Sequence, residues 1–172
     1  MTSAVPVAAG ERTTPAAGSR WPLACTSLFA IANLACASPA DGPPASAVVD
    51  AQFGDERLRI PLDALVERAT LAPDQDFSVT LIGSDDHQSH HVVAIRTAET
   101  PHRHDEHDLL VVVIEGRGSM LVGRQRQPVG AGSVVYIPRR TRHAFRNESG
   151  APATAYVIYT PPFDGKDRVA DE

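Results

Sequence analysis

The chain has 172 residues and a formal net charge of −5, and 42% of its residues are hydrophobic. This length suits one domain with room for an appendage, and the apolar content is enough for a buried core. The acidic balance and the lack of a basic stripe exclude nucleic acid as the expected partner.

The first 40 residues predict an export signal. Residues 1–20 are rich in Ala, Thr and Pro without hydrophobic periodicity, which is typical of a disordered segment. The uncharged run of residues 21–40 follows Arg20 and ends in small residues, the layout of a secretory signal peptide. Its apolar centre, residues 23–36, is shorter than the roughly 20 residues that a membrane-spanning helix needs.

Three alternatives remain for the end of this signal. The run Leu34-Ala35-Cys36 resembles a bacterial lipoprotein lipobox, with Asn33 at a position that is usually aliphatic. In that case Cys36 carries a lipid that anchors the protein to the outer membrane. The other two alternatives are cleavage after Ala37, which releases the protein into the periplasm, and an uncleaved anchor. Since the other cysteine is Cys25, residues 41–172 contain no thiol nucleophile, disulfide or CxxC zinc site.

The first half of the remaining chain predicts a few strands and one helix. A Pro- and Gly-containing linker, residues 41–46, opens it. Residues 61–70 have apolar side chains at helical spacing and predict one short amphipathic helix. Strands are expected at residues 47–53, 57–60, 76–82 and 91–97.

Short strands then follow one another closely, separated by Gly- and Pro-containing turns. They are expected at residues 109–114, 119–122, 125–129, 133–137, 143–147 and 154–160. Strands this short with frequent turn signals are typical of a sandwich or barrel. Residues 161–172 are expected to form an irregular tail over the surface. We therefore expect one domain at 41–172 with a core at 76–162.

Histidines gather at the start of this strand series. His102 and His104 are two residues apart, so an extended chain projects both to one face. Carrying the strand alternation back from Leu109 places His107 on the same face as Leu109 and Asp108 on the opposite face. Imidazoles grouped on an interior face repel when charged but share a metal ion when neutral. The alternative is an exposed loop whose histidines have no function.

These residues resemble the two sequence motifs of the cupin superfamily. Gly132, Pro138, His143 and Asn147 match the second motif, with Arg140 in place of its middle glycine. The first motif is matched by its two histidines, His102 and His104, and by Gly116, whereas Arg96 stands at its opening glycine. The resemblance implies an all-β fold, a small antiparallel jelly-roll barrel with a metal ion in its mouth. The expected short helix would precede this barrel.

The glutamate ligand of the first motif is missing. Its position falls on Leu109, or on Asp108 if the shorter of the two spacings allowed by the motif applies. Three ligand sets follow: His102, His104 and His143 alone, as in cupin thiol dioxygenases; these three with His107; or these three with Asp108. A barrel without a metal is the fourth alternative. The other histidines, His87, His90 and His91, are expected at the surface or behind the ligands.

The resemblance implies a function only in outline, because cupins include enzymes and non-catalytic binding domains. One hypothesis is an exported enzyme acting on a small molecule with a divalent metal ion, Fe, Mn or Zn, most simply an iron-type dioxygenase. The other is a non-catalytic envelope module that binds a metal or a small ligand. A homodimer is also expected from the resemblance.

Overall fold

The computed structural model describes residues 47–170. The expected export signal, including Cys36, lies outside these residues. Within them, none of the helical structure is long and apolar enough to span a membrane.

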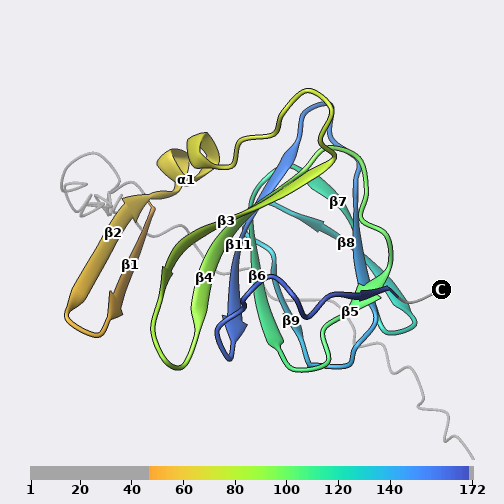
Figure 1. Ribbon diagram of the computed structural model, residues 1–172. Helices are drawn as coiled ribbons and strands as arrows, with labels where there is room; N and C mark the ends of the chain where they lie inside the picture. The colour runs from red at the N-terminus through yellow and green to blue at the C-terminus, as the bar shows by residue number, and fades with distance from the viewer. Residues whose placement is uncertain (1–46, 171–172) are drawn as a thin grey trace, which may run out of the picture. The chain divides into compact units, whose positions relative to one another are not determined.

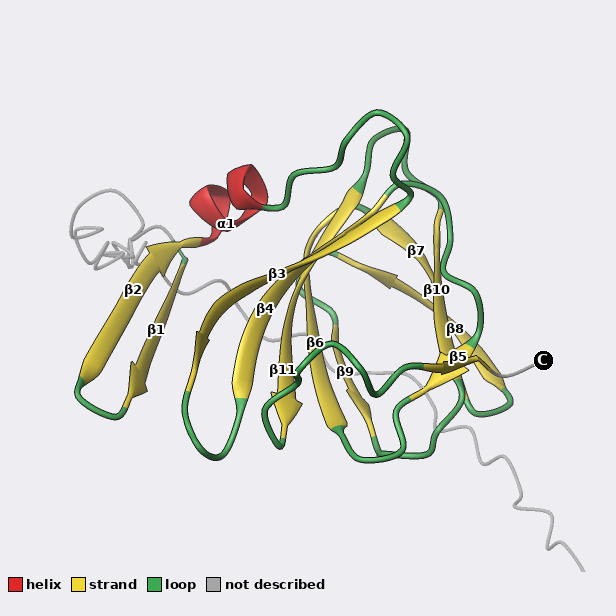
Figure 2. Ribbon diagram, viewed as in Figure 1, coloured by secondary structure: helices red, strands yellow, loops and turns green. Residues whose placement is uncertain are grey.

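Two five-stranded antiparallel sheets form the main body of the described domain (Figures 1 and 2). One sheet has the order β12-β5-β10-β7-β8, with the strands β12 (Val169–Ala170), β5 (His102–Arg103), β10 (His143–Asn147), β7 (Arg117–Val122) and β8 (Gln125–Gly130). The other has the order β3-β4-β11-β6-β9, with β3 (Phe77–Ser84), β4 (Ser89–Ile95), β11 (Ala153–Thr160), β6 (Asp108–Glu115) and β9 (Val134–Ile137). This is the expected all-β jelly-roll architecture.

Strand alternation explains how the core forms between the sheets. Along β6, Leu109, Val111 and Val113 are buried, and the first two belong to the main apolar cluster. Met120 and Phe145 enter the same cluster from the facing sheet. Because successive strand residues point to opposite faces, each strand contributes every second side chain to this core. The barrel interior is therefore lined mainly by apolar groups.

The outer face of the β3-β4-β11-β6-β9 sheet has its own apolar layer. Part of this face is covered by the hairpin of β1 (Val48–Phe53) and β2 (Glu56–Pro61) and by the helix α1 (Leu62–Arg68). Leu65 of α1 is fully buried against Val92 of β4 and Tyr156 of β11. Coverage on both faces explains why every residue of β4 is buried.

The predicted strands and the short helix are all present, with boundaries shifted by up to two residues. Two short strands, β5 and β12, were not predicted. Residues 161–172 were expected to form an irregular tail, but Val169 and Ala170 form β12, which pairs with β5. A two-residue strand has no sequence periodicity, so only its partner can reveal it.

Candidate metal centre

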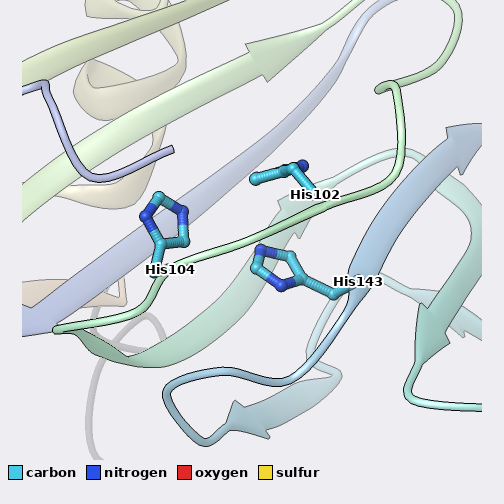
Figure 3. Close-up of side chains that lie close together, drawn as sticks. All are labelled: His102, His104 and His143. Atoms are coloured by element: carbon cyan, nitrogen blue, oxygen red, sulfur yellow. The ribbon is translucent and has the colours of Figure 1, made fainter. Parts of the chain in front are cut away.

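Three histidines meet where β5 and β10 run side by side (Figure 3). His102 and His143 are direct cross-strand partners, and their ring centroids lie 4.3 Å apart. His104 follows β5, and its ring lies 5.3 Å from His102 and 5.5 Å from His143. Each ring can offer a nitrogen such that the three lie within 4.8 Å of one another. All three residues are buried.

The turn before β10 helps to hold His104. Arg140, which stands at the glycine of the second cupin motif, has φ 63°, in the left-handed region that favours glycine. Its backbone N–H donates to the carbonyl oxygen of His104 at 2.6 Å. The positive φ of Arg140 therefore accompanies a backbone hydrogen bond that joins the two motif regions.

Backbone carbonyls fix the orientation of the three rings. The Nδ1 atoms of His102 and His143 lie 3.0 Å and 2.9 Å from the carbonyl oxygens of Thr100 and Thr141, and that of His104 bonds the carbonyl of Asp167. A carbonyl oxygen only accepts, so each Nδ1 carries the proton and Nε2 keeps its lone pair. This second-layer hydrogen bonding is typical of metal-binding histidines.

The guanidinium of Arg168 lies beside the ring of His102. Its Nη2 lies 3.2 Å from Nδ1 of His102. Since that nitrogen already carries a proton, we interpret the contact as a neighbouring charge and not as a hydrogen bond. Arg168 also lies over the ring of Phe77, 5.2 Å from its centroid.

The three imidazoles are neutral at physiological pH. Burial, followed by the neighbouring His143, lowers the pKa of His102 to about 3. The same two causes lower the pKa of His104 to about 4. Burial also lowers the pKa of His143, against the opposing effect of its bond to Thr141. Neutral rings are the form in which imidazole binds a metal ion, so the group fits a divalent cation.

The other two predicted ligands lie elsewhere. His107 is buried, with Nδ1 2.6 Å from the Asp167 carboxylate and Nε2 3.3 Å from the carbonyl of Pro162. The Asp108 carboxylate makes an ion pair with Arg139, at 2.8 Å from Nη2. Neither residue belongs to the group formed by His102, His104 and His143. The three-histidine set is thus the one that the fold brings together.

The C-terminal segment is tied to this centre. The carboxylate of Asp167 accepts hydrogen bonds from the backbone N–H groups of Asp105 and Glu106 at 2.9 Å and 2.8 Å, and from His107. Burial raises the pKa of Asp167, but its bonds to His107 and these N–H groups outweigh that effect and bring it to about 2. His104, His107 and Asp167 form a second group compatible with a metal ion. Their mutual hydrogen bonds already explain that grouping.

Two aromatic rings, Tyr159 and Phe163, lie between His104 of the centre and His91. Phe163 stacks on Tyr159 at 4.6 Å, and each ring also contacts both His104 and His91. His91 therefore lies behind the ligands, as one of the sequence alternatives proposed. His87 is exposed. His90 is buried on the other face of β4, against Phe53 and Tyr156, so a surface position for it is wrong.

A cavity of about 60 Å³ inside the barrel adjoins the histidines. His102 and His143 line it together with Leu109, the residue at the missing glutamate position. A space of this size suits a few water molecules or a ligand of a few atoms. Leu109 is 4% exposed and belongs to the core cluster, so its side chain packs where the family motif places a carboxylate.

Sequence reasoning missed three polar residues near the centre: Glu99, Asp167 and Arg168. Glu99 lines the same cavity as His102 and His143. Asp167 and Arg168 belong to the C-terminal segment, 60 or more residues from the histidines that they contact. Glu99 was detectable only by its position shortly before the histidine pair. The other two carry no local signal, because tertiary folding alone brings them there.

Comparisons with known proteins agree with this fold. Residues 89–159 match the family Cupin_2, Cupin domain. An uncharacterised protein of Aquifex aeolicus is 36% identical over 84 residues, which cover 49% of this chain and 69% of the relative. The matches to two further relatives span 61% and 58% of those proteins.

Solved structures share the architecture at low sequence identity. A double-stranded β-helix protein from Klebsiella pneumoniae has a TM-score of 0.53 and 14% identity, covering 62% of this chain and 95% of that protein. Streptomyces Pac13 with uridine has a TM-score of 0.51 and 16% identity, covering 62% and 88%. Pac13 is a nucleoside dehydratase. At these identities the likeness concerns the fold alone.

Proposed function

Since the chain belongs to the cupin superfamily, we propose that it is an exported protein that binds a divalent metal ion and uses it to transform a small molecule. His102, His104 and His143 hold the ion through their Nε2 atoms. The observation that carries this proposal is the set of three buried, neutral imidazoles whose Nδ1 atoms are all engaged by backbone carbonyls. Such a set fits Fe, Mn or Zn.

The three-histidine set favours an enzyme of the dioxygenase type. A metal ion held by His102, His104 and His143 would supply Lewis-acid or redox chemistry at this site. The residues around it orient the imidazoles and restrict water to a small cavity, which limits competing reactions. Substrates that enter without rearrangement of the core have only a few non-hydrogen atoms, because the cavity measures about 60 Å³.

That small cavity also supports the second candidate, a non-catalytic module that binds a metal or a small ligand. A space of about 60 Å³ is far below the roughly 300 Å³ of ordinary substrate pockets. Oxygen uptake by the iron-loaded protein in the presence of small thiols and small alcohols separates the two. Uptake that needs both iron and one of these compounds supports the enzyme. Stoichiometric iron without uptake supports the binding module.

The metal site itself is tested by metal content. We expect near-stoichiometric metal in the purified protein and a loss of at least 90% in His102→Ala, His104→Ala or His143→Ala, since two imidazoles bind a divalent ion weakly. The control is His87→Ala, which removes an exposed histidine. Full occupancy in all three ligand variants would refute the site.

Export, a lipid anchor at Cys36 and a homodimer are separate proposals. Export has its support in residues 21–40, an apolar run that follows arginine and ends in small residues. A fusion of residues 1–45 to a reporter that is active only outside the cytoplasm tests it, and a silent reporter would end the idea. Fatty-acid labelling that disappears in Cys36→Ser would support the anchor.

A further inference from the structure

Glu99 is held in an unusual pairing with β10. Its backbone N–H donates to the carbonyl oxygen of Phe145 at 2.9 Å. In return, the backbone N–H of Phe145 donates to the side-chain Oε2 of Glu99 at 3.0 Å. This reciprocal pair keeps the carboxyl group against a strand whose inner face lines the barrel. The side chain therefore lines the cavity beside His102 and His143.

The second oxygen of this carboxyl group, Oε1, has no hydrogen-bond partner among residues 47–170. The titratable or charged groups that face Glu99 are His102 and His143 in the cavity wall, Tyr159 of β11 and Arg168 of the C-terminal segment. Burial raises the pKa of Glu99, opposed by the Phe145 N–H and by the charge of Arg168. This oxygen is not fully buried, so a water molecule or a small ligand in the cavity can donate a hydrogen bond to it.

We propose that Glu99 is the carboxylate of the metal centre, in place of the glutamate that Leu109 replaces, and that it acts across the cavity without binding the ion. This inference rests on the proposed function. Glu99 falls outside the residues that could share an ion with His102 and His143. It contributes a negative charge, and Oε1 accepts a hydrogen bond from a small ligand that carries a hydroxyl or N–H group.

Charge balance gives Glu99 this role. Three neutral imidazoles bring no negative charge of their own to a divalent ion, and the ionised carboxylate of Asp167 nearby already accepts hydrogen bonds from His107 and two backbone N–H groups. An ionised Glu99 offsets the positive charge of the ion, and the attraction is strong because water screens it little. Binding of the ion therefore favours loss of the proton from Glu99, and an ionised Glu99 in turn strengthens binding of the ion.

The competing interpretation is purely structural, with Glu99 serving only as the acceptor for the Phe145 N–H. Glu99→Gln separates the two roles, because the amide oxygen still accepts that hydrogen bond while the charge is lost. The matched control is Glu115→Gln, which removes one negative charge at an exposed position at the end of β6. All three proteins keep the same histidines, so histidine titration cancels in their comparison.

The test is calorimetric titration of each full-length, metal-free protein with Zn²⁺ between pH 5 and pH 8. We expect Glu99→Gln to raise the dissociation constant for Zn²⁺ by about tenfold at pH 8. The ratio of this constant to that of wild type should fall towards one at pH 5, where Glu99 of wild type is protonated and therefore uncharged too. Glu115→Gln is expected to match wild type throughout. If the dissociation constants of Glu99→Gln and wild type differ by less than about twofold at every pH, the inference is overturned and the metal site is left intact. Failure of wild type to bind Zn²⁺ would overturn the proposed function as well.

A second measurement does not depend on the variant folding. In wild-type protein with ¹³C-labelled glutamate carboxyl groups, the NMR signal of one glutamate should have a titration midpoint at a higher pH than those of the exposed glutamates. Saturation with Zn²⁺ should lower this midpoint by about one pH unit or more. If no glutamate midpoint moves when Zn²⁺ binds, Glu99 does not respond to the ion and the inference is wrong.

Discussion

At the scale of single residues, the hydrogen bonds from Nδ1 of each imidazole to a backbone carbonyl set the ring tautomer and leave Nε2 free to bind a metal ion. Motif spacing and strand alternation predicted that His102, His104 and His143 lie together, and the structure brings these three rings to one place. The carbonyl groups that engage their Nδ1 atoms were not predictable, because residue spacing says nothing about ring tautomers. Glu99 escaped prediction for a similar reason, since the pattern directs attention to a carboxylate after the histidines and not before them.

Leu109→Glu tests what the missing ligand position now does. Without metal, the new carboxyl group is buried in the core, and we expect a loss of about 2–4 kcal/mol in unfolding free energy. With saturating Zn²⁺, much of this loss should be recovered, because the ion binds the folded state and pairs with the carboxylate. Urea unfolding with and without Zn²⁺ measures both effects.

The control for this variant is Leu109→Gln, which is polar but cannot ionise. Addition of Zn²⁺ should raise the unfolding free energy of Leu109→Gln by the same amount as that of wild type. If the glutamate variant recovers no more than the glutamine variant, position 109 does not face the ion.

At the scale of elements, the shortest strands carry the site. β5 supplies His102 and pairs with both β10 and β12. The longer strands were predictable from alternation and turn residues, whereas β5 and β12 exist only because their partners are in place. The C-terminal segment was expected on the surface, yet its Asp167 holds the loop that carries His104 and His107.

Stability should depend on acid through Asp167. Its folded pKa of about 2 lies below the ordinary value of 3.8, so its contribution is complete above about pH 4 and is lost as the pH falls towards 2. Allowing for solvent screening, we expect this contribution to be on the order of 1 kcal/mol. Urea unfolding of wild type and Asp167→Asn at pH 6, 4 and 3 measures it.

The difference between these two proteins should be constant from pH 6 to pH 4 and smaller at pH 3. A difference that grows on acidification would show that Asp167 does not act through its ionised carboxylate.

At the scale of the whole molecule, the all-β barrel followed from short strands, frequent turn signals and two motifs at matching spacing. The apolar layer outside the barrel did not follow from them. The apolar spacing in residues 61–70 predicted the helix α1. The sequence near Leu65 does not reveal that this side chain packs on Val92 and Tyr156. The cavity volume was also beyond prediction, because it depends on how side chains from both sheets fill the interior.

The most direct test of the central claim is anomalous X-ray scattering from crystals of the protein loaded with Zn²⁺. We predict one strong peak bonded by the Nε2 atoms of His102, His104 and His143, at about 2.0–2.1 Å from each. A peak between His104, His107 and Asp167, or no peak at any histidine, would contradict it.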